Sequence, residues 1–337
     1  MSGSDSFSSC SIQGGERIFV DFKLPAAALA ALRAGTAGYE LLFPKSPADS
    51  VLQAGGVDAG FSSAEILLGQ PDPKAVLASE SVRWVQVTSS GITRYDTPDF
   101  RSGVAEKGVA VCNSADVYAA ACAEHALAFM LAQSRNLIPA LQTSAFAKPA
   151  DWLAHRNACV SLRGQTVLMV GYGAIGRCLA DFLKPFGMRI LAWRRNPLPE
   201  AGVTFLRDEP ALATALGEAD HVVNLLPDSP STRHFFNASR LRLCRSDAVF
   251  YNIGRGATVN QSDLAMALRE KRLAAAWLDV TDPEPLPADH PLRREPRCRI
   301  TPHVAGGHAD EALSLVRHFL ENLRRAERGD PLINRVM

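Results

Sequence analysis

The sequence has no run of basic residues and almost no net charge. Its 36 lysine and arginine residues are balanced by 35 acidic residues, which gives a formal net charge of +1. Nucleic acids and anionic membrane surfaces attract proteins through clustered positive charge. We therefore expect neither nucleic acid nor a membrane among the partners of this protein.

Cysteine pairs and metal-ligand spacings are also missing. An odd, scattered set of cysteines without a CxxC pair is typical of free thiols in a reducing compartment. The sequence therefore predicts no disulfide framework and no metal site. The seven cysteines are Cys10, Cys112, Cys122, Cys159, Cys178, Cys244 and Cys298.

The N-terminal segment lacks the basic and apolar regions of a signal peptide. Residues 1–15 are rich in serine and glycine, which is the composition of a flexible tail. No apolar run is expected to approach the roughly 20 residues of a membrane span. From these absences we expect a cytoplasmic protein.

Short β-forming runs alternate with helical segments along two stretches of the chain. Five such runs occur between residues 17 and 114, and seven more between residues 166 and 301. This alternation predicts parallel strands joined by crossover helices. A chain of 337 residues is long enough for about two such domains. The expected fold class is α/β, and the second series is typical of a doubly wound sheet.

A long Ala-rich segment, residues 117–134, lies between the two series. It is predicted to be a helix, and because it is apolar nearly all round we expect it to be buried. It contains Glu124 and His125. These two residues are either functional or are polar groups satisfied within an interdomain or subunit contact.

The segment from Thr166 to Gly187 predicts a strand, a tight turn and a helix, and its turn has the spacing GxGxxG. In this spacing Gly171 permits the sharp turn, Gly173 lets the backbone approach a pyrophosphate, and Gly176 lets the helix pack closely on the strand. The N-terminus of the helix offers unpaired N–H groups to a diphosphate. The segment therefore predicts a dinucleotide site.

The next strand ends in the sequence AWRRNP, which contains no acidic residue. In NAD-type sites an acidic residue about 20 positions after the glycines binds the adenosine ribose. Arg194 and Arg195 stand at this place instead and can hold a 2′-phosphate, or they are part of a solvated turn. The sequence therefore predicts NADP as the cofactor, with NAD possible.

Five segments, in this order, carry a family resemblance: GYGAIGR, LLPDSPSTRHFFN, NIGRGATVN, WLDVTDPEPLP and TPHVAGG. Together they resemble the D-isomer-specific 2-hydroxyacid dehydrogenases, in particular glyoxylate/hydroxypyruvate reductases, from about Val82 to Val336. The resemblance implies a flavodoxin-like substrate domain, residues 1–112 and 307–337. It also implies a Rossmann nucleotide-binding domain, residues 113–306, a cleft between the two domains, and a homodimer with the long helix at its interface.

The resemblance assigns catalytic roles to Arg255, Glu284 and His303. Reduction of a 2-oxo acid needs a cation beside the carboxylate and carbonyl, and a proton donor at the developing alkoxide. A guanidinium supplies the first, and a histidine oriented by a glutamate supplies the second. Taken singly, each has a structural alternative: the arginine as a loop cap, the glutamate as a solvated turn residue, and the histidine as a core residue.

Other positions follow from the same resemblance. Substrate is expected to contact Arg255 and His303 together with the backbone amides of Ser90 and Gly91. The remaining cofactor contacts are expected at the pyrophosphate, the adenosine ribose and the nicotinamide. They are Ala174, Ile175, Leu226, Pro227, Ile253, Gly254 and Asp279.

The functional hypothesis is an NADPH-preferring reductase of a small 2-oxo acid, such as glyoxylate or hydroxypyruvate. One alternative is an NAD-dependent catabolic dehydrogenase of a D-2-hydroxy acid. A second alternative is a nucleotide-sensing interaction protein, because the resemblance extends to transcriptional corepressors on this fold. The catalytic residues do not separate these alternatives, but the absence of long interaction tails counts against the corepressor.

Overall fold

The computed structural model describes residues 12, 14–56, 58–143, 149–197 and 199–337. Most of the predicted N-terminal tail, including Cys10, therefore lies outside the described residues. The chain divides into two compact units, here called the first unit (residues 1–118 and 308–337) and the second unit (residues 119–307).

The first unit contains a sheet of five parallel strands in the order β2-β1-β3-β4-β5. All five predicted strands are present, in the chain order that the sequence indicated. The strands are β1 (Arg17–Val20), β2 (Glu40–Leu42), β3 (Ile66–Gly69), β4 (Trp84–Val87) and β5 (Ala110–Cys112). The helices are α1 (Ala26–Gly35), α2 (Ala59–Ser63), α3 (Pro73–Ala78), α4 (Pro98–Lys107) and α13 (Glu311–Arg328).

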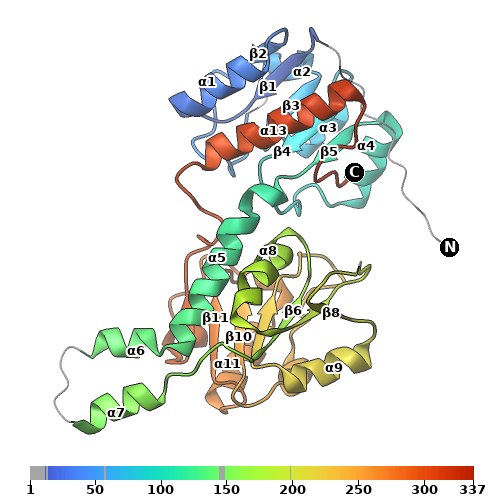
Figure 1. Cartoon of the computed structure of the whole chain (residues 1–337). Coiled ribbons are helices and arrows are strands. Elements are labelled where there is room, and N and C mark those ends of the chain that lie inside the picture. Colours follow the sequence, from blue (N-terminus) through green and yellow to red (C-terminus); the bar gives the residue numbers. More distant parts are fainter. Residues whose placement is uncertain (1–11, 13, 57, 144–148, 198) are drawn as a thin grey trace. The chain divides into compact units, whose positions relative to one another are not determined.

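Helices cover both faces of this sheet because successive strand side chains point to opposite faces. Ile18 packs in one apolar cluster with Leu32 of α1 and Phe319 of α13. Its neighbour Phe19 packs in a second cluster with Phe100 of α4. Figure 1 shows α1 and α13 side by side along the sheet. The first unit is therefore a doubly wound layer with the flavodoxin-like strand order.

The second unit contains seven parallel strands in the order β12-β11-β10-β9-β6-β7-β8. All seven strands were predicted. They are β6 (Thr166–Val170), β7 (Arg189–Trp193), β8 (Val203–Leu206), β9 (His221–Asn224), β10 (Val249–Asn252), β11 (Ala275–Leu278) and β12 (Cys298–Ile300). The helices are α5 (Ala115–Ser134), α6 (Leu137–Gln142), α7 (Pro149–Asn157), α8 (Ala174–Leu183), η1 (Lys184–Phe186), α9 (Glu209–Glu218), α10 (Ala238–Leu241), η2 (Gly256–Thr258), α11 (Gln261–Arg269) and α12 (Pro291–Arg294), and the first residues of α5 belong to the first unit.

The order of strands reverses at β6, which is the first strand of this series (Figure 1). Val170, at the end of β6, pairs with Trp193 of β7 on one side and with Asn224 of β9 on the other. The residues that follow these strands therefore lie level at one edge of the sheet. In doubly wound sheets this edge, at the point of reversal, is where dinucleotides bind.

The long helix α5 differs from the sequence expectation in two ways. By length and composition it could cross a membrane, with a mean hydropathy of 1.2 over its window, so the expectation that no run approaches a span is wrong for this segment. The helix was also expected to be buried, but only 39% of its most apolar 18-residue stretch is buried, and the burial is on one side. Ala123 and Ala126 are fully buried, whereas Ala120 and Leu131 are exposed. The pattern is that of a core helix with one open face.

The six described cysteines form no disulfide, as the sequence predicts for them. Burial raises the pKa of the Cys122, Cys244 and Cys298 thiols to about 12. These three thiols therefore stay protonated at neutral pH and behave as small apolar groups.

Candidate functional site

The loops that follow β9, β10 and β11 are packed backbone against backbone. A Cβ atom on Gly254 would lie 2.7 Å from the carbonyl oxygen of Leu226, and one on Gly256 would lie 1.9 Å from the carbonyl oxygen of Thr281. Gly171, after β6, has a φ of +97°, and a Cβ atom on it would lie 2.8 Å from the carbonyl oxygen of Leu225, in the turn after β9. These contacts bring the predicted residues of four strand ends into one cluster within the second unit.

Two buried side chains hold the backbone of Arg255. The carbonyl oxygen of Arg255 accepts hydrogen bonds from Asn252 Nδ2 at 3.1 Å and from Thr258 Oγ1 at 2.6 Å. The guanidinium Nη1 donates to the carbonyl of Gly254 at 2.7 Å. Asn252 and Thr258 were not singled out in the sequence, although a buried amide at a strand end is the kind of signal that could have found them.

His303 and Glu284 form a hydrogen-bonded pair. His303 Nδ1 lies 2.8 Å from Glu284 Oε2, and Glu284 Oε1 accepts the backbone N–H of Thr281 at 2.8 Å. The side chain of His303 is 50% exposed, and its Nε2 has no hydrogen-bond partner among the described residues. The pair therefore presents one ring nitrogen to an incoming molecule while the other nitrogen is fixed.

The hydrogen bond to Glu284 raises the pKa of His303, against the opposing effects of burial and of the Arg255 charge. For Glu284, burial raises the pKa, but the bonds from His303 and Thr281 outweigh it and leave the pKa below its usual value. The two shifts have opposite signs and are consistent with each other, because each favours the charged form of its side chain. The pair is therefore an imidazolium and a carboxylate over a wider pH range than isolated side chains would be.

The carboxylate of Asp279 fixes the loop that carries His303. It accepts hydrogen bonds from Thr301 Oγ1 at 2.6 Å and from the backbone N–H groups of Val304 and Ala305, both at 2.9 Å. The backbone N–H of His303 donates to the carbonyl of Asp279 at 2.9 Å. The sequence predicted Asp279 only as a cofactor residue, and that role stays a prediction.

His125, which the sequence left open, lies beside this loop. Its Nε2 is 3.3 Å from Thr301 Oγ1 and 3.8 Å from Asp279 Oδ1. Its ring packs against Phe129, with 4.4 Å between the ring centroids. The structure thus places His125 as a support of the His303 loop within the second unit, which fits the reading of a satisfied polar residue.

The turn after β6 can hold a phosphate group. Gly173 caps α8 without any side-chain hydrogen bond to the first turn, and a Cβ on Gly173 would meet nothing within 4 Å. Ala174 and Ile175 open the helix and are half-buried, and Gly176 is buried. The free amides at this helix start suit a pyrophosphate.

Arg194 and Arg195 follow β7 at the same edge of the sheet. Arg194 is half-buried and Arg195 is exposed. Within the described ranges neither guanidinium has a carboxylate partner, so both are available to an anion. Of the other predicted cofactor residues, Leu226 and Ile253 are buried and Pro227 is exposed.

Ser90 and Gly91 belong to the first unit, in the loop after β4. Asn113 Nδ2 donates to the carbonyl of Ser90 at 2.8 Å, and Ser89 Oγ donates to the carbonyl of Gly91 at 2.6 Å. The backbone N–H groups of Ser90 and Gly91 donate to no other group among the described residues. They are therefore free to bind a carboxylate.

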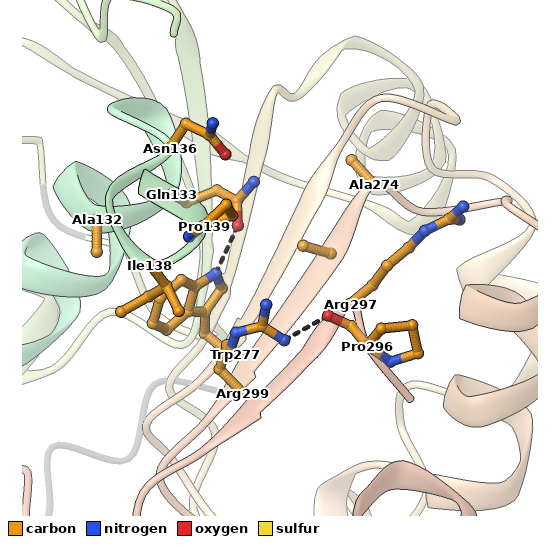
Figure 2. Close-up of a pocket in the computed structure, with 11 residues that line it drawn as sticks. Ala132, Gln133, Asn136, Ile138, Pro139, Ala274, Trp277, Pro296, Arg297 and Arg299 are labelled. Atoms are coloured by element: carbon orange, nitrogen blue, oxygen red, sulfur yellow. Dashed lines mark hydrogen bonds between the residues drawn. The ribbon is translucent and has the colours of Figure 1, made fainter. Parts of the chain in front are cut away.

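Two hollows lie in the second unit, and predicted site residues line one of them but not the other. One, of about 430 Å³, is lined by Asp279, Glu284 and His303. The other, of about 180 Å³, lies between residues 132–139 and the strands β11 and β12 (Figure 2). There the Trp277 indole donates to Gln133 at 2.8 Å, and no predicted site residue lines the hollow. Only the larger hollow belongs to the candidate site.

The chain is similar to known proteins along almost its whole length. A family model described as D-isomer specific 2-hydroxyacid dehydrogenase, NAD binding domain, matches residues 127–305. The human glyoxylate reductase/hydroxypyruvate reductase is 30% identical over 320 residues, which cover 94% of this chain and 96% of that protein.

Solved structures agree with these sequence matches. The D-isomer specific 2-hydroxyacid dehydrogenase from Xanthobacter autotrophicus Py2, in complex with NADPH and MES, matches with a TM-score of 0.76 at 25% identity, covering 96% of this chain and 98% of that one. The NADPH-dependent glyoxylate/hydroxypyruvate reductase from Sinorhizobium meliloti, in complex with NADP and malonate, matches with a TM-score of 0.70 at 26% identity, covering 95% and 96%.

Replacing Glu284 by glutamine should lower the pKa of His303. The amide keeps an acceptor for His303 Nδ1 but removes the charge that favours the imidazolium, so burial and Arg255 then dominate. NMR titration of the His303 ring in both proteins measures the change. Asp282→Asn, two residues away on the same loop, is the matched control and should leave the titration unchanged. An unchanged His303 pKa in Glu284→Gln would remove the carboxylate from the proposed pair.

Proposed function

Because the chain belongs to the D-isomer-specific 2-hydroxyacid dehydrogenase family, we propose that it is an NADPH-preferring reductase of small 2-oxo acids. Membership makes it an NAD(P)-binding oxidoreductase. The observation that carries the finer proposal is the His303–Glu284 pair. Nε2 of His303 has no partner among the described residues, and the charge of Arg255 lowers the pKa of both side chains, so the arginine lies close to the pair. A proton donor beside a cation is what the reduction of a 2-oxo acid requires.

Each residue has a separate task in this proposal. His303 gives its Nε2 proton to the oxygen that becomes the hydroxyl, and Glu284 keeps the ring oriented and protonated. Arg255 holds the substrate carboxylate and polarises the carbonyl with two parallel donors. The nicotinamide cofactor, when bound, supplies the hydride.

Besides Arg255, we assign contacts to the substrate carboxylate to the backbone amides of Ser90 and Gly91 in the first unit, and we assign nucleotide binding to the second unit. The free amides of Ser90 and Gly91 support the first assignment. The uncapped start of α8 and the match of residues 127–305 to a nucleotide-binding family model support the second. The relative from Sinorhizobium meliloti was solved with NADP and malonate, a small carboxylate.

The preference for NADP rests on Arg194 and Arg195. They stand where an acidic residue would repel a 2′-phosphate, and no described carboxylate neutralises them. The proposed cofactor site is completed by residues that follow neighbouring strands at the same edge of the sheet. They are Leu226, Pro227, Ile253, Gly254 and Asp279.

We also propose a homodimer formed through the open face of α5 and the helices that follow it. Several large apolar side chains are exposed there, and such patches mark protein interfaces. They are Leu131, Leu137, Leu141, Trp152, Leu153 and Val160.

Light scattering coupled to gel filtration should give a mass of two chains. Leu141→Glu combined with Leu153→Glu should shift the protein toward the monomer, because each charge would be buried in the interface. Leu52→Glu, at a leucine that is also exposed but lies in the first unit, should leave the mass unchanged. A monomeric parent protein at micromolar concentration would exclude the dimer.

The activity is tested by following NADPH and NADH oxidation over a panel of 2-oxo acids that includes glyoxylate and hydroxypyruvate. His303→Asn should lower kcat on the order of a hundredfold or more, the usual size of a general-acid contribution, while cofactor binding stays nearly intact. Asparagine suits the left-handed backbone at this position, where φ is +53°. Binding of cofactor without turnover of any panel member would favour the nucleotide-sensing alternative.

Arg194→Asp should weaken NADP binding by at least about tenfold and weaken NAD binding much less. One charge-assisted contact is worth about 1.5–3 kcal/mol, and about 1.4 kcal/mol corresponds to tenfold. Titration of both cofactors at low and high salt measures this, and the NADP contact should weaken with salt. Arg163→Asp, just before β6, is the control. Equal affinity of the parent for NAD and NADP would refute the assignment.

A further inference from the structure

A buried carboxylate lies at the point where the strand order of the first unit reverses. Asp21 follows β1, which lies between β2 and β3, and only 2% of Asp21 is exposed. Parallel α/β sheets bind their ligands at the carboxyl ends of strands beside such a reversal. A buried carboxylate at this place therefore needs an explanation.

The neighbouring backbone is shaped around this carboxylate. A Cβ on Gly69 would lie 1.7 Å from Asp21 Oδ1, and one on Gly55 would lie 2.4 Å from Asp21 Oδ2. Oδ2 accepts the backbone N–H of Gln70 at 2.8 Å, but Oδ1 is buried without a hydrogen-bond partner among the described residues. A half-satisfied carboxylate of this kind is costly when it is charged.

Gln70 connects Asp21 to both ends of the loop that holds Ser90 and Gly91. Gln70 Nε2 donates to Thr88 Oγ1 at 3.0 Å, just before this loop. At the other end, the hydroxyl of Tyr95 donates to the carbonyl of Pro71 at 2.9 Å and lies 3.5 Å from Gln70 Oε1. Thr88 and Tyr95 are both fully buried. The position of the loop is thus set by a network that begins at Asp21.

Charged groups around Asp21 are few. Burial raises the pKa of Asp21 to about 7, although the Gln70 N–H and the charge of Arg94 lower it. Arg94 lies in the loop after β4, with Nη1 3.5 Å from the carbonyl of Gln70. Tyr95 is a titratable neighbour among the described residues. Burial raises the pKa of Tyr95, the charge of Arg94 lowers it, and the charges of Asp21 and of Asp72, just before α3, raise it. Asp21 is therefore the group here that changes charge near neutral pH.

We propose that Asp21 is a positioning residue for the substrate: it takes up a proton when a small carboxylate binds at the Ser89–Gly91 loop, and its negative charge weakens that binding. The inference rests on the proposed function, because it uses the same carboxylate site. The network through Gln70 connects Asp21 to this loop. Two negative charges at the two ends of such a poorly solvated network disfavour each other, so binding of one anion favours protonation of the other. Substrate affinity should fall as pH rises through the pKa of Asp21, whereas the chemical step follows His303.

The test is calorimetry of malonate binding to the NADP complex at pH 7, in buffers with different heats of ionisation. His303→Asn serves as the background, because the imidazole would otherwise contribute its own proton. With Asp21 present, binding should take up a fraction of a proton, at most about half, since Asp21 is already half protonated at a pH equal to its pKa. Adding Asp21→Asn should abolish this uptake. Adding Asp49→Asn, an exposed carboxylate paired with Lys23, should not.

A second measurement covers the case in which Asp21→Asn does not fold. In the His303→Asn protein alone, malonate affinity should fall about three- to tenfold between pH 6 and pH 8.5. In the parent enzyme the KM for the 2-oxo acid should rise over the same range independently of kcat. Binding without proton uptake and without this pH dependence would overturn the proposal and leave the proposed function intact. No malonate binding by any of the proteins would remove the carboxylate site itself, and the proposal with it.

Discussion

The buried carboxylate of Asp279 makes the hydrogen bonds on which the candidate site of the second unit depends. It is almost fully buried, and three donors of residues 301–305 satisfy it. Without these bonds the loop would leave several buried polar groups unpaired, each costing about 1–3 kcal/mol. The loop holds His303 in a left-handed conformation with φ +53°, which non-glycine residues adopt infrequently. The direction of the imidazole is therefore set by a residue that lies one strand away.

Glycine makes the same arrangement possible at the neighbouring strand ends. Gly254 and Gly256 lie on either side of Arg255, and each packs against the backbone of another loop at a distance that excludes a side chain. The arginine is thereby held between two fixed points, and its carbonyl is fixed by Asn252 and Thr258. Close backbone packing and buried hydrogen bonds thus fix the backbone of Arg255, and the bond from its Nη1 to the carbonyl of Gly254 orients the guanidinium.

The sequence predicted the strands because buried parallel strands appear in a sequence as short apolar runs. The residues directly after these runs were then the candidate site residues. Apart from the pairing of His303 with Glu284, which the family resemblance implied, the sequence did not predict which of those residues support one another. The hydrogen bonds that Asp279 accepts from Thr301 and Ala305 connect residues more than 20 positions apart in the sequence, and no local sequence pattern predicts such a pairing. The open face of α5 was missed because an Ala-rich helix looks equally apolar on all sides. Asp21 was missed because an aspartate after a strand is also a common turn residue.

The two units treat their titratable groups in opposite ways. In the second unit His303 is half-exposed and pairs with the oppositely charged Glu284, so its charged form is favoured. In the first unit Asp21 is buried with one oxygen unpaired among the described residues, so its charged form is disfavoured. Exposure suits the first group to chemistry, and burial suits the second to setting the electrostatic field at a binding loop. If both proposals hold, a change of pH acts on the protein through two separate groups: through His303 on the donation of a proton, and through Asp21 on the affinity for an anion.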